Sequence, residues 1–107
     1  MMNLTPDQMW AAIQDLDSAA ELRFEPPVWY VRLPGVVYEA LNTMCAVASP
    51  QAHSKDQAIE WMWARLESLQ ETSSLHRNLG PAETLTGQQY EEVRWNGSEW
   101  VRIAIDG

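Results

Sequence analysis

The sequence predicts an α+β fold in which an antiparallel sheet of about four strands carries two helices on one of its faces. Three observations predict it. Residues 6–18 and 55–71 have apolar side chains at helical spacing, residues 28–41 and 90–105 are rich in β-branched and aromatic residues, and Asn96-Gly97 separates two strand-like runs. The resulting order is α-β-β-α-β-β within one domain, residues 1–107.

The first helix is predicted to begin at Thr5. Its hydroxyl can cap the helix, Pro6 suits the first helical position, and Gln8 stands where a capping box needs it. The helix should run to about Ser18 and bury a stripe of apolar residues, namely Met9, Ala12, Ile13, Leu16 and Ala20. Outside that stripe, the helical wheel puts Trp10 beside Asp17 and Glu21.

Two strands are predicted next, Val28 to Leu33 and Val36 to Leu41, joined by a turn at Pro34-Gly35. This pairing gives one buried face, which consists of Trp29, Val31, Leu33, Val36, Tyr38 and Ala40. Residues 41–48 fit either a strand or a helix by their spacing. We favour a strand because Ser49-Pro50 stops the run and the segment after it is a better helix.

The second helix is predicted from Lys55 to Glu71, with Ser54 as its cap. Its buried stripe should hold Ala58, Ile59, Met62, Leu66 and Leu69. Four acidic residues fall within a narrow arc on another face of this helix: Asp56, Glu60, Glu67 and Glu71. Residues 72–88 contain turn-forming residues and are predicted to be a long connection, which could hold a short helical turn or a functional loop.

The last segment predicts a β-hairpin with a two-residue turn at Asn96-Gly97. If Val101, Ile103 and Ile105 face the core, Trp100 points to the opposite side of the sheet. Val93 and Trp95 would join Trp100 on this outer face. A wider loop with a bulge would return Val93 to the core but would leave Trp100 outside.

Composition narrows the class of partner. A formal net charge of −8 argues against nucleic acid or an anionic membrane as a direct ligand, and it permits a basic protein. The chain has one cysteine, no signal-peptide pattern and no apolar stretch near the ~20 residues that cross a bilayer. We therefore expect a soluble protein of the cytoplasm.

No residue pattern predicts catalysis. Cys45, His53 and His76 are the only candidates for nucleophilic chemistry; Cys45 lies in an apolar run, and the two histidines lie in loops. These three residues also lack the spacing of metal ligands, and the glycines are isolated rather than gathered in a phosphate-binding loop. The sequence predicts neither an enzyme nor a cofactor or metal site.

The acidic residues of the second helix are the strongest candidate for a binding surface. Asp56, Glu60, Glu67 and Glu71 should rise in steps of ~6, ~10 and ~6 Å. Duplex phosphates follow a similar path, with a charge every ~3.4 Å per strand, so such a row could occupy a groove meant for DNA. An ordinary solvated helix face is the more common meaning of this pattern. Trp10 with Asp17 and Glu21 is a second candidate, unless Trp10 lies half-buried over the domain edge.

The chain resembles small bacteriophage proteins in being short, acidic and rich in tryptophan, with one cysteine and the ending Arg94-Trp95-Asn96-Gly97-Ser98-Glu99-Trp100-Val101. The resemblance implies the class of acidic inhibitors that mimic DNA and block host or defence enzymes. It covers composition and one hairpin, and it assigns no functional residue.

Together these observations predict a phage-encoded, non-enzymatic inhibitor in the bacterial cytoplasm that occupies the basic, nucleic-acid-binding surface of a host protein. The predicted partner-binding residues are Asp56, Glu60, Glu67, Glu71, Trp10, Asp17, Glu21, Trp95 and Trp100. The alternative is an assembly protein that docks or self-associates, for example as a homodimer, through a tryptophan-bearing sheet face.

Overall fold

The computed structural model of the chain describes residues 4–40, 43–78 and 90–103. Within these ranges the elements are α1 (Pro6–Leu16), β1 (Glu21–Glu25), β2 (Val28–Ala40), β3 (Thr43–Ala48), α2 (Lys55–Thr72), β4 (Ser74–Asn78), β5 (Tyr90–Trp95) and β6 (Trp100–Arg102). All strand pairs are antiparallel and form one sheet. The α+β class is confirmed, but the described sheet has six strands rather than about four, and the order is α-β-β-β-α-β-β-β rather than α-β-β-α-β-β.

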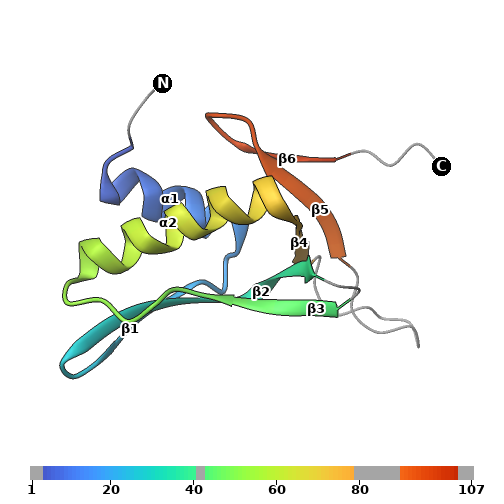
Figure 1. Cartoon of the computed structure of the whole chain (residues 1–107). Coiled ribbons are helices and arrows are strands. Elements are labelled where there is room, and N and C mark those ends of the chain that lie inside the picture. The colour runs from blue at the N-terminus through green and yellow to red at the C-terminus, as the bar shows by residue number, and fades with distance from the viewer. Residues whose placement is uncertain (1–3, 41–42, 79–89, 104–107) are drawn as a thin grey trace.

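The sheet curls around the two helices (Figure 1). β1, β2 and β3 lie below the helices in that view, β4 rises at the right, and β5 and β6 pass above. The helices lie side by side on the concave face, and both begin at the left of the picture. The prediction that both helices cover one face of an antiparallel sheet is therefore correct.

β2 is the strand on which the sheet is built. Arg32 pairs with Glu21 of β1 and with Ala48 of β3, so β1 and β3 lie on opposite edges of β2. β4 continues the β1 edge by pairing with residues 36–39. β3 pairs with β2 on both sides of a register shift between Leu33 and Val37.

The predicted turn at Pro34-Gly35 is wrong, because both residues lie inside β2. The chain bulges there, and the N–H of Gly35 donates to the Asp17 carboxylate at 2.7 Å. A bulge reverses the alternation of side chains, so Val31, Leu33 and Val36 all face the core. The predicted buried face is thus confirmed for these three residues, with Trp29 and Tyr38 half-buried against the core.

β3 confirms the strand prediction for the described part of residues 41–48; residues 41–42 lie outside the described ranges. The prediction of a long connection over residues 72–88 is wrong at its start, where Ser74–Asn78 forms β4. β4 joins β2 to β5, and its Leu75 is fully buried. Residues 79–89 lie outside the described ranges.

Both helix starts are confirmed. Thr5 and Gln8 form the reciprocal hydrogen bonds of a capping box, and Ser54 accepts from the N–H of Gln57 at 3.1 Å. α1 ends at Leu16 rather than at about Ser18, with Asp17 as its C-cap. The two helices bury Ala12, Ile13, Leu16, Ala58, Ile59, Met62, Trp63, Leu66 and Leu69 against the sheet.

The final hairpin exists, but its turn is not the predicted two-residue turn. Trp95 pairs with Trp100, which leaves a four-residue loop. The Asn96 side chain closes that loop by accepting from the N–H groups of Ser98 and Glu99, each at 2.9 Å. Gly97 adopts a positive φ of 105°, which suits glycine.

The predicted outward position of Trp100 is wrong. Val93 is buried, and Trp95 and Trp100 pack against the core on the same side of the hairpin. The Trp100 indole N–H donates to the carbonyl of Ala12 in α1 at 2.8 Å, and its ring centroid lies 6.0 Å from that of Trp63 in α2. Two indoles offer more apolar area to the helices than valine and isoleucine, so this face turns inward. Val101 and Ile103 remain half-exposed, and Ile105 lies outside the described ranges.

Candidate partner-binding surface

Four acidic side chains form a row along the exposed side of α2, which we call the acidic row: Asp56, Glu60, Glu67 and Glu71. All four are exposed, because the apolar stripe of α2 faces the sheet and leaves this arc in solvent. None of the salt bridges between described residues includes any of them. Their charges are therefore not neutralised by a partner within the described part of the chain.

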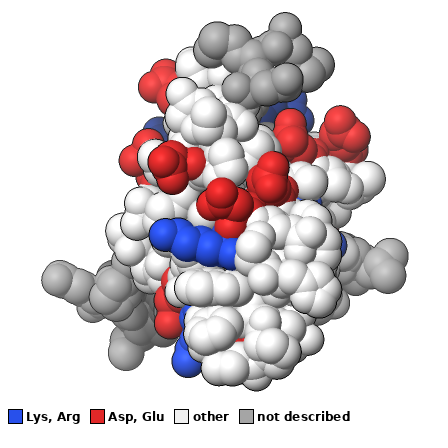
Figure 2. All heavy atoms as spheres, turned by 90° about the vertical axis from the view of Figure 1, so that its left-hand side faces the viewer, with Lys and Arg blue, Asp and Glu red and all other residues white. Residues whose placement is uncertain are grey.

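Acidic side chains gather at the end of the molecule where both helices begin. Figure 2 faces this end and shows them over its middle and upper parts, with a basic side chain lying across the middle. The lower part, where the β1–β2 hairpin lies, carries little charge in this view. A negative field concentrated over helices attracts positive surfaces and repels negative ones.

A hollow of about 470 Å³ lies beside the C-terminal half of the acidic row. Glu67, Gln70 and Glu71 of α2 line one side, and Arg94 and Trp95 of β5 line the other. We call it the acidic hollow. It brings together three residues that the sequence predicts as partner-binding: Glu67, Glu71 and Trp95.

Gln70 fixes the geometry of the acidic hollow. Its amide Nε2 donates to the carbonyl of Leu66 within α2 at 3.1 Å, and its Oε1 accepts from the backbone N–H of Trp95 at 2.8 Å. The side chain therefore ties the helix to the edge of the hairpin. Trp95 is held further by edge-on contact with Trp63, at a centroid distance of 5.0 Å and an angle of 88°.

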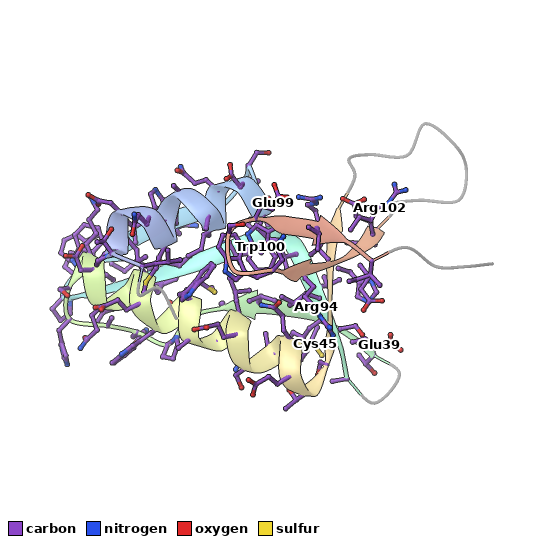
Figure 3. The ribbon with its side chains drawn as sticks, turned by 90° about the horizontal axis from the view of Figure 1, so that it is seen from above. Glu39, Cys45, Arg94, Glu99, Trp100 and Arg102 are labelled. Atoms are coloured by element: carbon purple, nitrogen blue, oxygen red, sulfur yellow. The ribbon has the colours of Figure 1, made fainter. Side chains whose placement is uncertain are left out.

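The chemistry of the acidic hollow suits a cationic side chain. Two carboxylates can pair with a guanidinium or an ammonium group, and an indole beside them adds cation–π attraction. Arg94 weakens this attraction, because its positive charge repels an entering cation. Its side chain is exposed on the part of the hairpin that faces α2 (Figure 3). It forms no salt bridge with the described residues, so its charge acts on whatever enters the hollow.

The second predicted cluster is not assembled. Trp10 is half-buried in α1 and packs against the core. Asp17 is buried, and its carboxylate accepts from the N–H groups of Ala19 and Gly35. Glu21, which the helical wheel places beside Trp10, lies instead on β1 and pairs with Arg23 at 3.6 Å. A chain reversal after Leu16 separates these residues, which a helical wheel cannot show.

The other predicted residues divide between surface and core. Asp56 and Glu60 extend the acidic row toward the start of α2. Trp100 is half-buried behind Trp95, with the two ring centroids 5.3 Å apart, and it lies over the space between the helices (Figure 3). Its position serves the packing of the hairpin rather than an outer sheet face.

Sequence reasoning missed one residue of this surface and one exposed aromatic residue elsewhere on α2. Trp61 leaves 38% of its area exposed, although it is a large apolar residue, and it points about 100° round the helix from Glu60, away from the acidic row. Its place on the polar side of the helical wheel would have indicated this exposure. Arg94 was also missed, and its role depends on the twist of the hairpin toward α2, which no local pattern reports.

The residues considered for catalysis lie on different elements. Cys45 is half-buried on β3, His53 is exposed before α2, and His76 lies on β4 with a buried Nε2 that lacks a hydrogen-bond partner. In the described ranges, no three His, Cys, Asp or Glu side chains meet in a way that could hold a metal ion. Neither helix of the described residues is long and apolar enough to cross a membrane.

Comparison of the chain with protein-family models, with curated proteins and with solved structures finds no match.

Proposed function

We propose that this chain is a non-enzymatic inhibitor, encoded by a bacteriophage, that occupies the basic surface of a host protein that handles nucleic acid. The observation that supports it is the acidic row, which is exposed, unpaired among described residues and continuous with the acidic hollow. The row would take the place of a phosphate backbone, and the hollow would receive one arginine or lysine of the partner.

An aromatic residue gives this surface an apolar component, because Trp95 lines the acidic hollow. Tryptophan is enriched among the residues that contribute most to protein–protein binding. A surface that combines carboxylates with an indole fits a basic protein that offers arginine side chains, because a guanidinium can pair with both.

The experiment is a capture from bacterial lysate with the immobilised protein, at low and at high salt, with added duplex DNA as competitor. Captured proteins should be nucleic-acid-binding proteins that duplex DNA releases. Glu60→Lys/Glu67→Lys should reduce capture at least about tenfold, because two attractions become repulsions. Capture should also fall with salt, since the contacts are screened over ~10 Å at 0.1 M.

A matched variant separates this surface from net charge. Glu39→Lys/Glu99→Lys makes the same change in charge at two exposed residues of β2 and of the hairpin turn, away from the acidic row (Figure 3). It should leave capture unchanged. Equal loss in both variants, or retention in Glu60→Lys/Glu67→Lys, would contradict the proposal. Thermal melts should show that all variants fold, because exposed substitutions rarely cost more than ~0.5 kcal/mol.

A further inference from the structure

Within the described part of the chain, β3 is an edge strand: its only strand partner is β2, and no described strand pairs with its other side. Its free edge presents backbone N–H and C=O groups that an extended segment could satisfy. This surface is separate from α2 and from the acidic row.

β3 also lacks the charges that usually protect such an edge. Its sequence, Thr-Met-Cys-Ala-Val-Ala, has no charged residue and no proline. Each of the other strands in the described ranges carries at least one arginine or glutamate. Natural proteins place lysine, proline or inward-pointing charges on exposed edges to prevent pairing between sheets. β3 has no such protection.

The direction of the free backbone groups follows from the pairing with β2. Arg32 pairs with Ala48, and the next N–H along, that of Ser49, donates to the carbonyl of Val31 at 2.9 Å. This bond pattern marks Arg32 and Ala48 as a non-hydrogen-bonded pair, so the polar backbone groups of Ala48 point away from β2. Residues alternate along a strand, so those of Ala46 also point to the free edge.

We propose that two copies of this chain pair antiparallel through their β3 edges about a two-fold axis. A second copy fits because an antiparallel pair about a two-fold axis sets the same strand, with matching free N–H and C=O groups, opposite itself. The net charge of −8 makes copies repel each other in general, but β3 has no charged residue and sets no acidic side chains opposite each other. The exposed side chains of Ala46 and Ala48 are small, which leaves room for a second backbone beside this edge.

The pairing places Cys45 near the two-fold axis. Cys45 is near the middle of β3, and its free thiol is half-buried. In an antiparallel pair centred on Cys45 or Ala46, the cysteines of the two copies come close together. The protein has one cysteine, so any thiol cross-link between copies reports this edge alone.

Sedimentation equilibrium of the full chain, over about 10 to 500 µM, tests the pairing, because a dimer with a small contact is weak and concentration-dependent. The wild type should pass from monomer to dimer in this range. Ala46→Lys should shift that transition to at least about tenfold higher concentration, because it sets two lysines beside each other at the edge. Ala64→Lys, at an exposed position of α2, makes the same charge change and should leave the dimer intact.

Both variants add the same positive charge, so a difference between them reports the β3 edge and not the net charge. Added lysine lowers the net negative charge, so general repulsion between copies falls in both variants. Only blockage of the β3 edge can make Ala46→Lys more monomeric than Ala64→Lys. A wild type that stays monomeric throughout, or an Ala46→Lys variant that dimerises like the wild type, would overturn the proposal.

Cross-linking of Cys45 with a short bis-maleimide gives a second measurement, which does not require a host partner. Covalent dimer should form in the wild type and in Ala64→Lys and should fall about tenfold in Ala46→Lys. A dimer by sedimentation that yields no cross-link would place the interface elsewhere and overturn the pairing through β3. High salt should leave the dimer intact, whereas it should disrupt the proposed host contact.

Discussion

The Asp17 carboxylate fills the place where a side chain at residue 35 would be. Its Oδ2 accepts from the N–H of Gly35 at 2.7 Å, and its Oδ1 accepts from the N–H of Ala19 at 2.9 Å. A Cβ added at Gly35 would lie 2.6 Å from Oδ1. The end of α1 and the bulge of β2 are therefore fixed to each other by one buried carboxylate.

Gly35→Ala should lower the free energy of unfolding by about 1–3 kcal/mol, because the methyl group displaces a carboxylate that two N–H groups hold. Asp17→Ala should cost a similar amount, since the N–H of Gly35 loses its acceptor. The double variant should cost less than the sum, because removal of the carboxylate makes room for the methyl group. Urea unfolding of the four proteins measures this coupling, and strictly additive losses would contradict it.

Trp100→Ala should destabilise the fold by about 3–5 kcal/mol, because it removes an indole packed against Trp63 and Trp95 and a hydrogen bond to Ala12. Trp100→Phe should keep part of the packing. Its free energy of unfolding should fall by about 1 kcal/mol for the lost hydrogen bond, with a further loss because the phenyl ring is smaller than the indole. Trp61→Ala, at an exposed site, should cost far less. Thermal or urea unfolding of the three variants measures these losses. Equal losses of stability in Trp61→Ala and Trp100→Ala would contradict the placement of Trp100 against the core.

Some elements could be predicted because their signals are local. The capping residues Thr5 and Ser54 fix the helix starts, and Asn96-Gly97 marks a chain reversal. Pro34-Gly35 has an equally local turn signal, but tertiary contact with Asp17 keeps it within β2. β4 has one apolar residue among five and therefore lacks the apolar alternation by which strands are recognised. β1 does alternate, but over five residues it offers only Leu22 and Phe24, which is too short a pattern to stand out beside the longer strand that follows.

The candidate site was predictable only along one helix. The acidic row follows from helical periodicity within α2, so its shared exposure could be read from the sequence. The acidic hollow needs β5 to pass beside α2, an arrangement set by Gln70 and by the indole contacts of Trp63. The inward position of Trp100 could not be predicted from the hairpin alone. Either face of the hairpin has apolar side chains, and which face turns inward depends on the side chains of the helices that pack against it.

Tyr30 provides a pH-dependent reporter of the β1–β2 hairpin. Its hydroxyl donates to Glu25 at 2.9 Å, and this hydrogen bond raises the pKa of Tyr30 above the ordinary value of 10.0. The bond favours the neutral phenol. Its contribution to stability is therefore complete below pH 10.0 and is lost as the pH rises through the folded-state pKa.

Glu25→Gln should lower the pKa of Tyr30 toward its ordinary value, because the carboxylate acceptor is gone. Phenolate absorbance measured during an alkaline titration follows the three tyrosines together, and Tyr30→Phe identifies the contribution of Tyr30. An identical titration curve in Glu25→Gln would show that the hydrogen bond does not set this pKa.

Arg94→Gln should strengthen the proposed contact with a basic partner about three- to tenfold, because it removes a like charge from the wall of the acidic hollow. Arg23→Gln makes the same charge change on β1 and serves as the control. Binding to the captured partner by calorimetry gives the comparison. Weaker binding in Arg94→Gln would mean that the hollow receives an acidic or neutral group instead.

β4 has a consequence for how the molecule unfolds. On one side of it lies the meander of β1, β2 and β3; on the other lies the hairpin of β5 and β6. Five residues, among them the buried Leu75, carry every strand-to-strand link between the two groups in the described sheet. Within the sheet, the coupling of the two groups thus depends on this one short segment, and the remaining links of the hairpin run to the helices through Gln70 and Trp100. Weakening β4 would leave the hairpin held by the helices alone, so that its amide protons exchange with solvent faster than those of the meander.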